Sequence, residues 1–150
     1  MEPDLLIAHS EGRAPALRLP HAYPFHVLDR AVVLAPGRWA VGMKNLTRDD
    51  PLVDAEGRLA SVLLAEAMAQ TAGLAASEAS GSASAAVLAQ IDRFRCRPSV
   101  VAGYHLLVAA RVVRRFGAAV KVRASVKVDG RLRAAAEFVL RFPQPSRREQ

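Results

Sequence analysis

The sequence predicts an α+β fold in which a curved antiparallel sheet wraps around one central helix. Two observations support this prediction. Residues 62–76 form one apolar stretch of helical length, and nearly everything else reads as strands joined by short turns. A helix that is apolar nearly all round is usually buried. A highly curved sheet around it is the economical way to pack these elements.

The first half of the chain predicts a strand hairpin followed by a loop. Residues 27–34 are rich in β-branched side chains and end at Pro36-Gly37, which indicates a strand and a turn. Residues 39–46 predict the second strand of the hairpin. Residues 47–59 are charged and contain proline and glycine, so we expect a loop there.

Ser61 is placed to cap the helix predicted over 62–76, because its hydroxyl can accept a backbone N–H at the helix start. The stretch 77–84 consists mainly of small residues and predicts a loop. Further strands are expected over 86–94 and 105–116.

The clearest strand pattern lies between Val120 and Val128, where apolar and polar residues alternate strictly. Asp129-Gly130 then predicts a tight hairpin into a last strand over 131–142.

Composition is that of a soluble globular protein, with 51% hydrophobic and 23% charged residues among 150. We expect a lead-in over 1–18, a single domain over 19–143 and a basic tail over 144–150. No apolar run is long enough for a membrane span, so no membrane partner is expected. The single cysteine, Cys96, cannot form an intrachain disulfide, which fits a cytoplasmic location.

The net charge of +7 requires an explanation. Nucleic acid is one candidate partner, because arginine and lysine neutralise phosphates. However, aromatic residues make up only 5% of the chain, and no DNA- or RNA-binding signature is found. We therefore expect no nucleic-acid partner and no metal site. An acidic protein or an acidic phosphorylated cofactor fits the charge equally well.

Glu66 and Gln70 are the strongest candidates for a functional site. They lie four residues apart in an otherwise apolar helix, and a carboxylate in such surroundings loses hydration, which favours its protonated form. It could then act as a general acid. The alternative is that Glu66, Gln70 and Ser77 form one solvated stripe on the helix surface.

Four groups of residues in the right order resemble the hot-dog-fold 3-hydroxyacyl-ACP dehydratases of bacterial fatty acid synthesis. The resemblance extends from Leu19 to Phe142. The matching groups are Leu19-Pro20-His21 with Tyr23-Pro24-Phe25 and Asp29-Arg30; Lys44-Asn45-Leu46-Thr47 through Pro51; Glu66-Ala67-Met68-Ala69-Gln70; and Ile91-Asp92-Arg93-Phe94 with Arg97-Pro98 and Gly103.

The resemblance implies a hot-dog fold and a homodimer or higher homo-oligomer that acts on acyl thioesters carried by acyl carrier protein (ACP), without a cofactor. It assigns Glu66 the role of catalytic acid and Gln70 that of its polar neighbour. Ser61 falls where the family has an amide-donating glycine. The exposed arginines expected to dock the acidic ACP are Arg93, Arg95 and Arg97, although ordinary solubilising arginines at a strand edge are the alternative.

The family's catalytic histidine, which precedes the helix, has no counterpart. The loop from Pro51 to Ser61 contains no histidine. Asp54 or Glu56 falls near its place, but an exposed carboxylate is a poor base for a weakly acidic carbon acid. The other histidines, His9, His21, His26 and His105, are expected to be structural or surface residues, with a rearranged site left open.

Three hypotheses for function follow. The chain is an acyl-ACP dehydratase or isomerase whose base has moved, with altered or lost dehydratase activity. Alternatively, it is an acyl-ACP or acyl-CoA thioesterase that uses Glu66 and a water molecule. In the third hypothesis it is a non-catalytic binding protein, or a subunit that pairs with an active dehydratase. Fold alone does not choose among them.

Overall fold

A computed structural model describes residues 25–77, 86–97 and 100–143 of the chain. In this part, six strands form one antiparallel sheet and one helix packs against it. The elements in chain order are β1 (Arg30–Ala35), β2 (Trp39–Asn45), α2 (Ser61–Ala76), β3 (Val87–Cys96), β4 (His105–Phe116), β5 (Ala119–Val128) and β6 (Arg131–Arg141).

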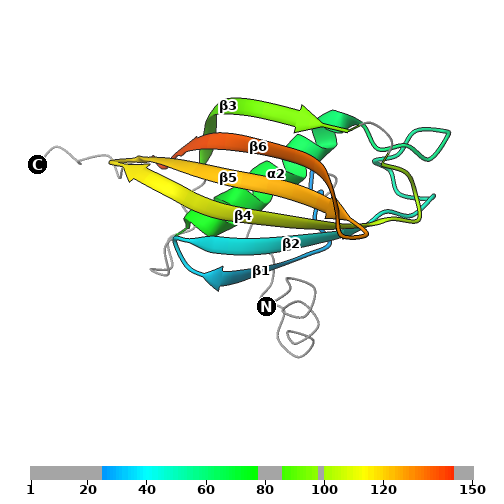
Figure 1. The fold of residues 1–150 in the computed structure, drawn as a ribbon, viewed down its shortest axis with the longest axis horizontal. Helices are drawn as coiled ribbons and strands as arrows, with labels where there is room; N and C mark the ends of the chain where they lie inside the picture. The colour runs from blue at the N-terminus through cyan, green and yellow to red at the C-terminus, as the bar shows by residue number, and fades with distance from the viewer. Residues whose placement is uncertain (1–24, 78–85, 98–99, 144–150) are drawn as a thin grey trace, which may run out of the picture.

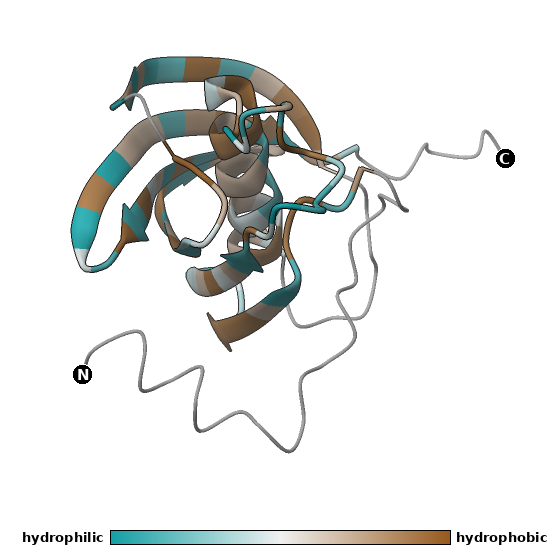
Figure 2. Cartoon of the chain, turned by 90° about the vertical axis from the view of Figure 1, so that its right-hand side faces the viewer, coloured by the Kyte–Doolittle hydropathy of each residue, from teal (hydrophilic) through white to brown (hydrophobic). Residues whose placement is uncertain are grey.

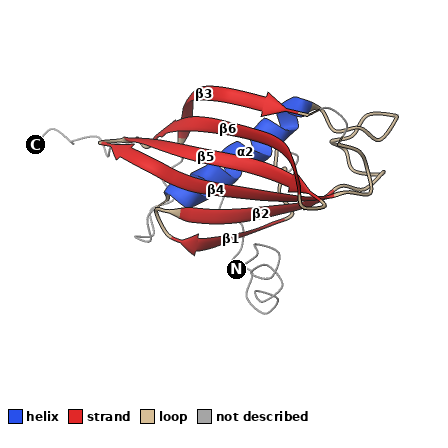
Figure 3. Ribbon diagram, in the orientation of Figure 1, coloured by secondary structure: helices blue, strands red, loops and turns tan. Residues whose placement is uncertain are grey.

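The strands are ordered β1-β2-β4-β5-β6-β3, so the two strands nearest the helix in sequence do not neighbour each other in the sheet. The helix crosses the concave side of the sheet (Figures 1 and 3) and contacts the central strands β4, β2 and β5 most extensively. The α+β hot-dog architecture predicted from the sequence is confirmed.

Strict alternation in β5 places its valines in the core and its charged residues on the convex face. Val122 and Val126 are fully buried, and alternating bands of hydropathy are visible along the long strands (Figure 2). The predicted Asp129-Gly130 hairpin is also confirmed. Both residues have positive φ, 49° for Asp129 and 72° for Gly130, as a tight two-residue hairpin turn requires.

Close packing of α2 on β2 depends on a glycine. A Cβ atom at Gly42 would lie 2.8 Å from Thr71 Oγ1 and 2.9 Å from Leu28 Cδ1. The Thr71 hydroxyl itself is buried and donates to the Ala67 carbonyl of the preceding turn. The helix therefore approaches the sheet where a side chain is missing, and most of its residues are buried, as predicted.

Two local predictions are wrong. The first strand begins at Arg30 rather than at Val27, because Val27 donates its N–H to the Gln70 side chain instead of to a strand. Ser61 is not the helix cap: Ala60 occupies that position, no side chain caps the helix, and Ser61 is the first helical residue. The predicted lead-in 1–18, nearly all of the small-residue loop and the tail 144–150 lie outside the described residues.

Candidate functional site

Glu66 and Gln70 contact each other on α2, as their spacing predicts. Gln70 Nε2 donates a hydrogen bond to Glu66 Oε1 over 2.8 Å. The solvated-stripe alternative is wrong for Gln70, which is only 3% exposed, whereas Glu66 is half-buried. Apart from Ser61 and Leu63 in the first turn, the residues of α2 that are not buried are Val62, Glu66, Ala69 and Gly73, which share one helical face.

Gln70 also ties the helix to the segment that precedes β1. Its Nε2 donates to the Phe25 carbonyl over 2.7 Å, and its Oε1 accepts from the Val27 N–H over 3.2 Å. Because a backbone carbonyl and a backbone N–H flank it, the orientation of the side-chain amide is fixed. Its second N–H therefore points at Glu66, and this hydrogen bond orients the carboxyl group.

The start of α2 offers backbone donors beside this pair. Leu63 N–H bonds to the Ala60 carbonyl, but among the described residues the N–H groups of Ser61 and Val62 have no acceptor. No acidic side chain lies in the first turn. Unpaired N–H groups at a helix start carry partial positive charge and suit a polarised oxygen.

The carboxylates near the place of the missing histidine are both engaged with Arg58. Asp54 accepts from the Arg58 backbone N–H over 2.7 Å and from Arg58 Nε over 3.1 Å, and Glu56 Oε2 contacts Arg58 Nη2 over 3.0 Å. The backbone bond from Arg58 is the main reason that the pKa of Asp54 is lowered. A carboxylate held in its charged form in this way is a weaker base still.

A buried lysine near the end of β2 was not recognised as important from sequence. Lys44 is only 7% exposed and lies between two carboxylates, with Nζ 3.0 Å from Asp29 Oδ1 and in direct contact with Asp50. Asp29 also accepts from the Asn45 N–H over 2.6 Å. Burial alone would lower the pKa of Lys44, but its hydrogen bonds to Asp50 and Asp29 outweigh burial and raise it. The cluster fastens the 47–59 loop to the sheet.

His26 lies between the two residues that hold Gln70, and its Nε2 atom is buried without a hydrogen-bond partner among the described residues. It is therefore the described histidine whose backbone adjoins the Glu66–Gln70 pair most directly. His105, in contrast, lies at the start of β4 with Nδ1 2.6 Å from Asn45 Oδ1, as expected for a histidine at a strand end.

Arg93, Arg95 and Arg97 are all exposed at the β3 edge of the sheet. Arg93 has a φ of 53°, which is unusual for a residue other than glycine, and it lies in a bulge where the β3–β6 register shifts between Asp92 and Arg95. Arg93 and Arg95 thus lie on the strand that ends the sheet, and Arg97 directly follows it.

The convex face carries an ionic cluster around Glu137 of β6. Glu137 contacts Arg123 Nη2 over 2.8 Å and Lys121 Nζ over 2.9 Å. Hydrogen bonds from Arg123 first and Lys121 second lower its pKa to about 2. Because this folded-state pKa lies below the usual value, the cluster stabilises the fold above about pH 4.5, and this contribution is lost as the pH falls towards 2.

We expect Glu137→Gln to lower the free energy of unfolding at neutral pH and to flatten its decline between about pH 4.5 and pH 2. Urea unfolding at a series of pH values measures this, with Glu56→Gln as an exposed-carboxylate control. If the free energy of unfolding of the Glu137 variant declines between about pH 4.5 and pH 2 as steeply as that of the wild type, the cluster does not govern stability in acid.

The described residues include no cluster of histidine, cysteine, aspartate and glutamate side chains that could hold a metal ion. The helix that the structure describes, α2, is not long and apolar enough to cross a membrane.

A family model described as a FabA-like domain matches residues 19–137. The 3-hydroxyacyl-ACP dehydratase FabZ of Listeria monocytogenes is 32% identical over 126 residues, which cover 81% of this chain and 88% of that protein.

Solved structures show the same fold. The dehydratase heterocomplex ApeI:P from Xenorhabdus doucetiae has a TM-score of 0.73 at 19% identity, over 85% of this chain and 90% of its own. The protein smu.793 from Streptococcus mutans, bound to acetyl CoA, has a TM-score of 0.65 at 20% identity, over 84% of this chain and 96% of its own.

Proposed function

The chain belongs to the FabA-like family, and on that premise we propose that it binds acyl thioesters carried by ACP, with a dehydratase activity that is altered or lost. The observation that carries this proposal is the oriented Glu66–Gln70 pair beside the open start of α2. A half-buried carboxylate and a buried amide cost free energy of desolvation, so a pocket without a function would gain stability by replacing them with apolar residues.

Glu66 is suited to exchange a proton with a bound acyl group. Its Oε1 atom is occupied by Gln70, whereas within the described residues Oε2 has no partner. A carboxyl group held at one oxygen and open at the other can protonate a leaving hydroxyl or orient a water molecule. The N–H groups of Ser61 and Val62 would polarise the thioester carbonyl.

Dehydration also needs a base that removes the C2 proton, and none is evident. Asp54 and Glu56 are held by Arg58, so neither takes the place of the missing histidine. His26, next to the residues that bind Gln70, is the candidate for a displaced base. Without such a base the site would bind acyl thioesters without dehydrating them, or would pair with an active dehydratase subunit.

A thioesterase is the second candidate, because hydrolysis needs only one carboxylate and a water molecule. The Oε2 atom of Glu66, without a partner among the described residues, would orient that water, and the loop from Pro51 to Ser61, which has no histidine, favours hydrolysis over dehydration. In either case Arg93, Arg95 and Arg97 are proposed to dock the acidic carrier, since they are exposed and close in sequence at the β3 edge.

A homodimer through β3 completes the proposal. β3 is an edge strand of ten residues. Leu88 and Ile91 are 40% and 44% exposed, although they pair with the core residues Leu140 and Phe138 of β6. They therefore extend the concave apolar face beyond the part that α2 covers. A long apolar edge is a liability unless another chain pairs with it.

Product analysis separates the candidate functions. The purified protein is incubated with 3-hydroxyacyl-ACP and with acyl-ACP, and the products are identified by mass spectrometry. Loss of water supports a dehydratase with a displaced base, and release of free acid supports a thioesterase. Binding without turnover supports a non-catalytic member. Absence of both binding and turnover with every acyl-ACP would contradict the proposal.

A further inference from the structure

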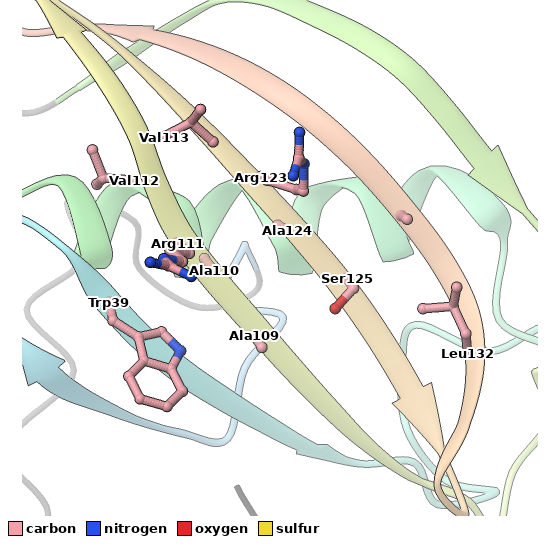
Figure 4. Close-up of a pocket in the computed structure, with 11 residues that line it drawn as sticks. Trp39, Ala109, Ala110, Arg111, Val112, Val113, Arg123, Ala124, Ser125 and Leu132 are labelled. Atoms are coloured by element: carbon pink, nitrogen blue, oxygen red, sulfur yellow. The ribbon is translucent and has the colours of Figure 1, made fainter.

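The convex face of the sheet, opposite α2, carries a trough that crosses the strands. Its floor is a row of small residues in register across three adjacent strands: Ala109 of β4, Ser125 of β5 and Ala135 of β6. Figure 4 shows this floor open between Trp39 on one side and Leu132 on the other. The trough holds about 460 Å³ of open space.

Larger residues form the walls, two positions from the floor on β4 and β5 and three positions from it on β6. One wall contains Trp39, Arg111 and Arg123, which are paired across β2, β4 and β5. The other contains Leu107, Lys127 and Leu132, paired across β4, β5 and β6. On β4 and on β5 the two walls are four residues apart along the strand, about 13 Å between backbones. This is close to the 10–12 Å diameter of an α-helix.

The charge of the walls is positive and partly unbalanced. Arg123 is paired with Glu137, but among the described residues Arg111 and Lys127 have no carboxylate partner. None of the described residues that line the trough is acidic. Its large apolar residues are also exposed, with Trp39 at 36%, Val113 at 49% and Leu132 at 52%. Apolar anchors between unpaired cations are the surface that an acidic, amphipathic segment would fit.

The trough also leads to an arginine at the sheet edge. Ala135 pairs with Arg95 of β3, so the floor row ends at a further cation. On β2 the same row contains Val41, which is fully buried, so the open floor begins at Ala109 of β4. From β4 to β3 the row spans three strand spacings, about 14 Å. A helix of about 10 residues has this length.

We propose that the convex trough binds an acidic amphipathic helix of a partner protein, with apolar side chains on the floor and carboxylates against Arg111 and Lys127. A second copy of this chain fits poorly, since a two-fold contact would set the same arginines and lysine against themselves. A nucleic-acid duplex is wider than the trough, and of the described residues that line it only Trp39 is aromatic. This proposal does not depend on acyl-thioester binding.

The test uses a synthetic 14-residue helical peptide with a leucine stripe flanked by glutamates, and a matched peptide with lysines in place of the glutamates. We expect the acidic peptide to bind and to shift the amide NMR signals of Ala109, Ser125 and Ala135. Arg111→Glu is expected to weaken binding by about tenfold or more. Arg48→Glu, an exposed arginine in the 47–59 loop, is the control and should leave binding unchanged.

Ala109→Trp fills the floor and is expected to abolish peptide binding, while thermal unfolding reports whether the variant remains folded. Three results would overturn the proposal. The acidic and basic peptides could bind equally; Arg111→Glu could have no effect; or sedimentation could show self-association that Ala109→Trp removes. Tighter binding of a short DNA duplex or of anionic lipid vesicles than of the acidic peptide would also contradict it.

Discussion

Lys44→Met is expected to lower the free energy of unfolding by about 3–5 kcal/mol, the usual cost of leaving a buried ion pair without one partner. The Asp50 side chain is only 7% exposed. In the Lys44→Met variant its negative charge would lie beside an apolar methionine side chain. Asp29 would keep only its bond to Asn45. Urea unfolding followed by circular dichroism measures this change.

Its matched control is Lys127→Met, a lysine on the convex face without a carboxylate partner in the described part of the chain. This control should change stability by less than about 0.5 kcal/mol. Lys44 stabilises the fold in its charged form and its folded pKa is raised, so its contribution should persist from neutral pH upward and be lost only above about 10.5. Equal stability of the Lys44 variant and the wild type would show that the cluster is not structural.

Ile91→Lys is expected to convert a dimer into monomers. Ile91 is 44% exposed and pairs with Phe138 of the core, so a lysine there would place a charge in the apolar surface that the second copy is proposed to cover. Activity or acyl-thioester binding should fall together with the dimer, since Ile91 extends the apolar face against which α2, the helix that bears Glu66, packs.

Sedimentation velocity measures this outcome, and Val113→Lys is the control. Val113 is 49% exposed on β4, far from the β3 edge in the strand order. We expect Val113→Lys to leave the dimer intact. If the Ile91 variant remains dimeric, the dimer forms through another surface.

Local patterns predicted the architecture well. The alternation in β5, the Asp129-Gly130 turn and the apolar helix each depend on neighbouring residues, and each is confirmed. Helix start and strand start were less predictable, because they depend on partners distant in sequence. Ser61 satisfies the local rule for a cap, yet the chain enters the helix one residue earlier.

The site was predictable only in part for the same reason. The spacing of Glu66 and Gln70 places them on neighbouring turns, and their hydrogen bond follows from it. The bonds from Gln70 to Phe25 and Val27 join residues more than forty positions apart, so no local pattern reveals them. Asp29, Lys44 and Asp50 likewise meet only when the sheet forms. In the sequence, the importance of these three residues is indicated only by the fact that they fall within the groups that resemble the dehydratase family.

Glu66→Gln, assayed against acyl-ACP substrates by mass spectrometry, tests the central claim most directly. The variant keeps the size of the side chain and removes its ionisable group. We expect every turnover seen with the wild type to be abolished, while Glu56→Gln, a carboxylate in the exposed salt bridge to Arg58, stays at wild-type activity. Turnover by the Glu66 variant at the wild-type rate would contradict the assignment of the Glu66–Gln70 pair as the acyl-thioester site.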